Sequence, residues 1–139
     1  MVELDAFLQA RELLFRYRTD HDAACAHFRW PELHRFNWAL DYFDRYAEGN
    51  GRSALICQED DGRVAQVSFE EMRRRSNQVA NHLRRLGVDR GDRVMVMLGN
   101  VPPLWETILG CMKLGAVLIP ATTLLTPRDL DDRIVRGAI

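Results

Sequence analysis

The chain has 139 residues, which fits a single domain, and its 47% hydrophobic content is typical of a globular core. Its 19 basic and 20 acidic residues leave a net charge of −1, which argues against a general binding surface for nucleic acid or anionic membranes. The three cysteines imply no disulfide framework and no apolar run is long enough to span a membrane, so a cytoplasmic location is expected.

The sequence predicts two regions, a helical N-terminal extension over 1–36 and a first α/β subdomain over 37–139. The opening segment has one apolar helical face, formed by Leu4, Phe7, Leu8, Leu14 and Phe15. A second short helix is predicted over 20–28, before Pro31, which disfavours helix in the residue that precedes it. The acidic start, with no basic and then apolar run, is unlike a signal peptide.

The subdomain is predicted to begin with a capped helix and a β-hairpin. Asn37 can cap a helix with its side-chain oxygen, and a Gly-Asn-Gly sequence ends that helix. Short strands over 54–57 and 64–69 follow, with Asp61-Gly62 at the tip of the turn between them.

The next predicted helix is defined at both of its ends. Ser68 and Glu71 form a capping box, in which the serine oxygen accepts a free backbone N–H and the glutamate reaches back to the cap. The helix ends at Gly87, which suits a left-handed cap. The face expected to be buried consists of Phe69, Met72, Ser76, Val79, Ala80, Leu83 and Leu86.

A strand–helix–strand unit completes the predicted subdomain. Five consecutive apolar residues over 94–98 are typical of a strand of a parallel sheet that is buried on both faces. Asn100 is expected to cap the helix that follows, and the next strand covers 116–119. This connection is long enough for a right-handed helical crossover. Thr126 is expected to cap a last helix.

The sequence lacks the known phosphate-binding loops. Neither G-x-G-x-x-G nor G-x-x-x-x-G-K-[ST] occurs. Because ligands bind beyond the carboxyl ends of parallel strands, the better places are 99–100 and 120–124. Thr122 and Thr123 could offer hydroxyl groups to a ligand there, and local hydrogen bonding in a turn is the competing interpretation.

The remaining polar residues do not indicate a catalytic or metal site. His21, Cys25, His27 and His34 lack the paired close spacings of structural zinc sites, so we interpret them as polar helix surface. The arginine-rich face of the central helix is interleaved with glutamates, which favours a solvated face over a nucleic-acid site. Cys111 lies in an apolar helix and is expected to pack as a small hydrophobe.

The most specific motifs are FNWALDYFD over 36–44, RSNQVANHLR over 75–84 and KLGAVLIPATT over 113–123. Together with the shorter motifs RYRTD and RGDRV, they resemble medium-chain acyl-CoA synthetases over nearly the whole chain. These are AMP-forming ligases of the AMP-binding, adenylate-forming enzyme family, and the resemblance is to their N-terminal part.

The resemblance implies a two-step ligase reaction in fatty acid metabolism. A carboxylic acid, medium-chain fatty or aromatic, and Mg-ATP give an acyl-adenylate and pyrophosphate, and coenzyme A then displaces AMP. ATP, Mg²⁺ and coenzyme A are the cofactors that the resemblance implies for the whole enzyme. The family's phosphate loop and catalytic lysine have no counterpart in this sequence. We therefore expect a fragment without catalytic residues or metal, which binds no cofactor and is inactive alone.

Thr122, Thr123 and Leu124 are the candidate cofactor-binding residues, because their loop resembles one that borders the coenzyme A and acyl site in relatives. The alternative hypothesis is a stand-alone, non-catalytic interaction or dimerisation module. A truncated parallel sheet would expose an edge, and apolar surface around Trp105 and Met112 is expected to be partly exposed, which a homo-oligomer would cover. A third hypothesis, a nucleotide-binding regulatory domain, is not favoured, because such a domain would need a phosphate loop and the sequence contains neither known motif.

Overall fold

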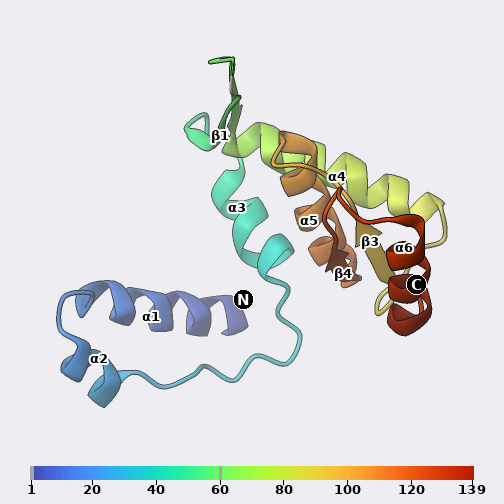
Figure 1. The fold of residues 1–139 in the computed structure, drawn as a ribbon. Coiled ribbons are helices and arrows are strands. Elements are labelled where there is room, and N and C mark those ends of the chain that lie inside the picture. The colour runs from blue at the N-terminus through green and yellow to red at the C-terminus, as the bar shows by residue number, and fades with distance from the viewer. Residues whose placement is uncertain (1, 60) are drawn as a thin grey trace. The chain divides into compact units, whose positions relative to one another are not determined.

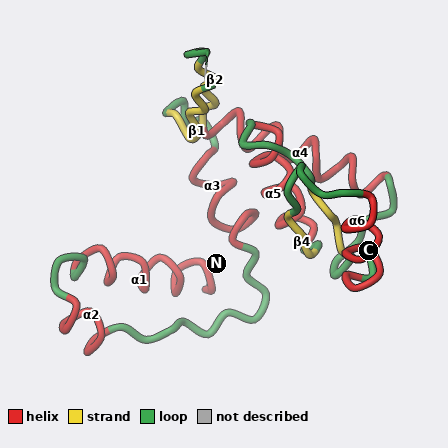
Figure 2. The backbone as a smooth tube through the Cα atoms, viewed as in Figure 1, coloured by secondary structure: helices red, strands yellow, loops and turns green. Residues whose placement is uncertain are grey.

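The computed structural model describes residues 2–59 and 61–139, which separate into two compact units, Met1–Phe36 and Asn37–Ile139 (Figure 1). In the first unit, α1 (Val2–Arg16) and α2 (His21–His27) are followed by an irregular segment (Figure 2). Both predicted helices are confirmed.

The irregular segment of the first unit is held against α1 at its far end. The Glu3 carboxylate accepts backbone N–H groups of His34 at 2.9 Å and Arg35 at 3.0 Å. The rings of Phe7 and Phe36 stack with centroids 5.0 Å apart. These contacts close the segment after α2 into a loop that returns to the first turns of α1.

The second unit combines helices with two small sheets. Strands β1 and β2 pair in an antiparallel hairpin, and β3 and β4 pair in parallel. The predicted α/β class, with a hairpin and a parallel pair, is therefore confirmed. The elements are η1 (Trp38–Phe43), a π-helical turn, then α3 (Asp44–Ala47), β1 (Ser53–Gln58), β2 (Val64–Ser68), α4 (Phe69–Arg85), β3 (Arg93–Val96), α5 (Pro102–Leu114), β4 (Val117–Pro120) and α6 (Pro127–Gly137).

Asn37 begins the second unit as predicted. Its Oδ1 atom accepts the backbone N–H groups of Ala39 at 3.0 Å and Leu40 at 3.2 Å, which caps η1. Its amide nitrogen also donates to the carbonyl oxygen of Met112 in α5 at 2.8 Å. One side chain thus caps a helix and fixes that helix against a distant one.

The capping box that starts α4 is confirmed, and Gly87 follows the helix with a φ of +90°. Met72, Ser76 and Ala80 form its buried face. The prediction that Leu86 is buried is wrong, because this residue is 68% exposed. Leu86 is the C-cap, where the chain already turns away from the helix axis.

Two predictions about the segment formed by β3, α5 and β4 are wrong. Strand β3 ends at Val96, and Leu98 lies beyond the strand and is exposed, so the apolar run is not buried on both faces over its whole length. Asn100 does not cap α5. The N-cap is Val101, and Pro103 at the second helical position has no N–H for a cap to bind. Asn100 Oδ1 instead accepts the Trp105 indole N–H at 3.1 Å.

The core lies where α3, the hairpin and α4 meet. Phe43, Ala47, Val67 and Met72 form its buried cluster. Partly buried side chains that pack on this cluster are Ala54, Leu55, Phe69 and Leu109. In the described part of the chain, no helix combines the length and the apolar character that crossing a membrane requires.

Helices α4 and α5 form the most extensive helix–helix contact of the second unit, and they approach closely at Gly110. A Cβ atom on this glycine would lie 2.9 Å from Val79 Cγ1 and 3.2 Å from the backbone nitrogen of Ala80. The absence of a side chain at this position therefore sets the distance between the two helices.

We expect Gly110→Ala to lower the free energy of unfolding by about 1–3 kcal/mol, because the added methyl group overpacks the contact between α4 and α5. Urea denaturation followed by circular dichroism measures the change. Gly51→Ala is the matched control, since an added Cβ there meets no atom within 4 Å. Equal stability of the two variants would contradict this account of the helix contact.

Candidate functional site

The loop after β4 lies at the carboxyl end of the parallel pair. It begins beside the end of β3, because the backbone N–H of Ala121 donates to the carbonyl oxygen of Val96 at 2.9 Å. Thr122, Thr123 and Leu124 are all exposed on it, and Leu124 is 86% exposed. The three candidate residues are thus together and accessible at the edge where ligands of α/β sheets bind.

The hydroxyl oxygen of Thr122 takes part in a local turn. It accepts the backbone N–H of Leu124 at 3.3 Å. Just beyond, Thr126 caps α6 in a capping box with Asp129, so the predicted cap is confirmed. This turn is the local hydrogen bonding that competes with ligand binding as the role of Thr122, and it shapes the loop.

The groups that this loop can offer to a ligand carry no charge. Two hydroxyl groups and exposed backbone groups can hydrogen-bond a ligand, but they do not supply the positive charge that stabilises a phosphoryl group in transfer. Among residues 2–59 and 61–139, no group of three or more His, Cys, Asp and Glu side chains is placed to hold a metal ion. Thr122, Thr123 and Leu124 can therefore offer hydrogen bonds and apolar contact to a ligand, but no positive charge.

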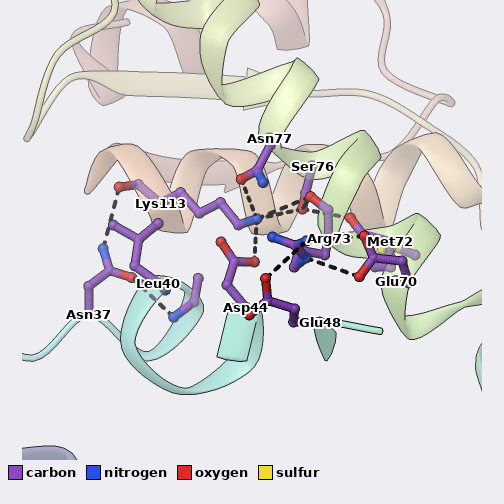
Figure 3. Close-up of polar contacts among 11 residues, drawn as sticks. Asn37, Leu40, Asp44, Glu48, Glu70, Met72, Arg73, Ser76, Asn77 and Lys113 are labelled. Atoms are coloured by element: carbon purple, nitrogen blue, oxygen red, sulfur yellow. Dashed lines mark hydrogen bonds and ion pairs between the residues drawn. The ribbon is translucent and has the colours of Figure 1, made fainter. Parts of the chain in front are cut away.

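A buried polar cluster surrounds Lys113 of α5, whose side chain is 3% exposed. Its Nζ atom lies 2.7 Å from Asp44 Oδ1 of α3. It also donates to Ser76 Oγ at 2.9 Å and to Asn77 Oδ1 at 2.7 Å, both on α4. Figure 3 shows the ammonium between the side chains of these three residues. One charge therefore joins three helices.

The environment of Lys113 leaves it no chemical role toward a substrate. Burial lowers the pKa of Lys113, and the nearby Asp44 carboxylate opposes this shift. The Asp44 Oδ1 atom forms an ion pair with the ammonium at 2.7 Å and accepts no hydrogen bond. An ammonium has three N–H donors, and this one donates to Ser76 Oγ, to Asn77 Oδ1 and, at 3.4 Å, to the carbonyl oxygen of Arg73. We conclude that Lys113 is structural.

A second set of charges surrounds this cluster (Figure 3). Arg73 donates two hydrogen bonds to the Glu70 carboxylate, at 3.1 and 3.2 Å, and lies 3.8 Å from Glu48. Glu70 also accepts the backbone N–H of Gly49 at 2.8 Å. The hydrogen bonds from Arg73 and from Gly49 lower the pKa of Glu70. These contacts tie the end of α3 to the start of α4.

Lys113 and Asp44 lie in the motifs 113–123 and 36–44, but no role was predicted for either side chain. The local signal for burial is a charged residue within the apolar sequence of α5. Because charged residues are rarely fully buried without a partner, such a lysine indicates a buried acceptor elsewhere. The sequence does not reveal which carboxylate supplies it.

The four residues considered as metal ligands are not brought together as a set. Cys25 Sγ lies 3.5 Å from His21 Nε2 on α2. The ring of His27 instead stacks on Tyr17, with centroids 5.4 Å apart, and the backbone of His34 binds Glu3.

Comparison with known proteins identifies the class. Residues 43–137 match the family model described as AMP-binding enzyme. The chain belongs to this family, as the resemblance in its sequence motifs predicted. The matched region begins in η1 and ends in α6, so it contains the Lys113 cluster, the parallel pair and the loop that carries Thr122.

The individual relatives are acyl-CoA synthetases and related ligases. The chain is 37% identical over 102 residues to a mitochondrial acyl-coenzyme A synthetase of Rattus norvegicus, covering 68% of this chain and 18% of the relative. It is 34% identical over 105 residues to a 4-hydroxybutyrate–CoA ligase of Metallosphaera sedula, covering 73% and 19%. The chain thus spans about a fifth of the length of these relatives.

Solved structures agree with this assignment. An acyl-CoA synthetase of Brucella canis superimposes with a TM-score of 0.75 at 29% identity, over 85% of this chain and 23% of that one. A benzoate CoA ligase from Burkholderia xenovorans superimposes with a TM-score of 0.59 at 30% identity, over 74% and 20%. The fold of this chain is one that these ligases share.

We expect Lys113→Met to lower the free energy of unfolding by about 3–5 kcal/mol, because it leaves the Asp44 carboxylate without its buried partner. Adding Asp44→Leu should restore part of the loss, since the second change removes the unpaired charge. Urea denaturation of both variants measures the coupling.

Arg136→Met is the control for this experiment. It breaks an exposed ion pair with Asp132, in which the Arg136 side chain is 80% exposed, and should cost less than about 1 kcal/mol. If Lys113→Met and Arg136→Met lowered stability equally, the Lys113 cluster would not hold the helices together.

Proposed function

We propose that this chain supplies the N-terminal part of an AMP-forming acyl-CoA synthetase. Residues 1–36 are the N-terminal extension, and residues 37–139 are the first α/β subdomain of the AMP-binding domain. The observation that carries the proposal is the family match over 43–137, together with a fold shared with a solved acyl-CoA synthetase.

The reaction of the whole enzyme joins a carboxylic acid to coenzyme A with cleavage of ATP to AMP and pyrophosphate, through an acyl-adenylate. ATP, Mg²⁺ and coenzyme A are its cofactors, and the acid is a medium-chain fatty or aromatic acid. The relatives support an acid–thiol ligase, since their names include an acyl-CoA synthetase, a 4-hydroxybutyrate–CoA ligase and a benzoate CoA ligase. We place the enzyme in the cytoplasm and in fatty acid metabolism.

The chain alone is proposed to be inactive and to bind no cofactor. Both half-reactions need positive charge near the groups that are transferred, and the loop after β4 offers neutral donors. The Lys113 ammonium is enclosed by its own acceptors. The loop residues Thr122, Thr123 and Leu124 are proposed to contact coenzyme A at one edge of a site that other parts of the enzyme complete.

Calorimetry of the chain with Mg-ATP and then coenzyme A should show no heat of binding, and an assay of pyrophosphate release with octanoate should show no turnover. A chimera tests the assignment itself. This chain replaces the matching part of the Brucella canis acyl-CoA synthetase, and the chimera should form acyl-CoA. In that chimera, Leu124→Asp should raise the KM for coenzyme A several-fold and leave the KM for ATP unchanged.

Pyrophosphate release by the chain alone would overturn its proposed inactivity. A chimera that folds, as judged by circular dichroism, but forms no acyl-adenylate would overturn the assignment to this enzyme. An equal rise in both KM values would contradict the proposal that Leu124 contacts coenzyme A.

The second candidate function is a non-catalytic interaction module that forms a homodimer. The observation that favours it is apolar exposure on α5, where Trp105 is 41% and Met112 is 40% exposed, as the sequence analysis predicted. In the described residues the parallel sheet also has only two strands, whose edges can pair with another chain.

The molecular mass of the chain in solution, measured by light scattering after size-exclusion chromatography, tests the interaction-module hypothesis. The module predicts a dimer that binds neither Mg-ATP nor coenzyme A, and Met112→Glu should shift it to a monomer. Val135→Glu changes an apolar residue of α6 that is 78% exposed and should leave the dimer intact. A monomer that binds no hydrophobic dye would contradict the module.

A further inference from the structure

Three exposed arginines at the C-terminal end of α4 carry charge that the described part of the chain does not neutralise. Arg84 and Arg85 lie in the last turn of the helix, and Arg90 lies in the loop before β3. None of the three forms an ion pair within residues 2–59 and 61–139. Residues 82–93 include four arginines and two aspartates, which leaves a net charge of +2 when the histidine is neutral. This end of α4 is therefore a basic surface.

The two aspartates of this segment form no ion pair with the arginines. The Asp92 carboxylate instead accepts the backbone N–H of Asp89 at 2.8 Å. The loop after α4 is thus closed by its own hydrogen bond, and the guanidinium groups are left for a partner.

The arginines near the start of α4 are in a different environment. Arg73 lies 3.1 Å from the Glu70 carboxylate, and Arg75 lies 3.3 Å from the Glu71 carboxylate. Residues 72–88 contain no acidic residue, so such pairs cannot form within the second half of the helix. The interleaving of arginine with glutamate, which favours a solvated face, therefore describes only the first half of α4.

An exposed apolar side chain lies directly beside these charges. Leu86, which follows Arg85 as the C-cap of α4, is 68% exposed. The chain turns immediately after it, because Gly87 has a φ of +90°. Leucine beside arginine is a combination that suits the surface of a lipid bilayer, where the apolar side chain enters the acyl boundary and the guanidinium groups stay among the phosphates.

We propose that residues 84–90 bind the surface of an anionic lipid bilayer. Charge complementarity supports this partner, since the headgroups supply the negative charge that the three arginines lack within the chain. Leu86 favours a bilayer over nucleic acid, because a phosphate backbone is bound through charge and offers an apolar side chain no environment to enter. One leucine and three arginines give weak, reversible attachment to the bilayer surface.

This inference is independent of the proposed ligase function. The backbone N–H of Gly91 donates to the carbonyl oxygen of Gly115 at 3.0 Å, and these residues precede β3 and β4. The basic surface therefore lies toward the amino edge of the parallel pair, whereas the loop that carries Thr122 lies at the carboxyl edge. A bilayer bound at residues 84–90 leaves that loop open to a ligand.

Co-sedimentation of the chain with vesicles tests the proposal. The chain should bind vesicles of phosphatidylcholine with about 30% phosphatidylserine, not vesicles of phosphatidylcholine alone, and about 1 M NaCl should release it. Arg84→Ala and Arg85→Ala together should lower the partition coefficient about 25-fold, since each arginine near an anionic surface contributes about fivefold. Leu86→Ser should lower it about tenfold, because the apolar contact with the acyl boundary is lost.

Arg45→Ala and Ile56→Ser are the matched controls. They remove an exposed arginine of α3 and a 63% exposed apolar side chain of β1, and both elements lie toward the other end of α4 (Figure 1). Both variants should bind the anionic vesicles as the unaltered chain does, and circular dichroism verifies that every variant is folded.

Four results would overturn the proposal. They are no binding to anionic vesicles, equal binding to neutral ones, equal losses in the control variants, and binding that Leu86→Ser leaves unchanged. A duplex DNA fragment that displaces the vesicles and binds the Leu86→Ser variant equally well would assign the surface to nucleic acid instead.

Discussion

The second unit depends on the enclosure of the Lys113 ammonium by side chains from three helices. Removing an ammonium from water costs several kcal/mol, and a buried partner recovers this cost only with good geometry. Asp44 supplies the opposite charge from α3, while Ser76 and Asn77 supply acceptors from α4. The cluster therefore favours one arrangement of α3, α4 and α5, because displacing α3 or α5 separates the ion pair and displacing α4 removes hydrogen-bond acceptors of the ammonium.

Two uncharged contacts reinforce that arrangement. Gly110 lets α4 and α5 approach more closely than any side chain would allow. Asn37 caps η1 and also binds the carbonyl oxygen of Met112, near the end of α5 that leads into β4. Helix α5, which carries Lys113, also contacts β3 and β4, so the cluster is linked to the strand that leads into the loop after β4.

The position of that loop explains why its chemistry differs from that of the buried cluster. The charges of Lys113 and Asp44 lie between helices inside the second unit, where they stabilise the fold. The side chains at the carboxyl edge of the sheet are neutral and exposed. Such an edge can contribute hydrogen bonds and apolar contact to a ligand, while charge must come from other residues.

Local signals determined much of this structure from the sequence alone. The caps at Asn37, Ser68 and Thr126 depend on hydrogen bonds within a few residues, and each forms as expected. The cap expected at Asn100 failed for an equally local reason, because the proline at the second helical position lacks the N–H that a cap binds. The family resemblance was likewise readable from contiguous motifs.

Tertiary structure decided which residues are buried and which charges pair. The five apolar residues over 94–98 were expected to be covered on both faces, yet Leu98 is exposed, because burial depends on which distant elements pack on the strand, and no local pattern encodes them. Lys113 and Asp44 lie far apart in the chain, and the local sequence of Lys113 indicates a buried partner without identifying it. Only the packing of three helices brings them to 2.7 Å, because pairing of buried charges depends on distance in space.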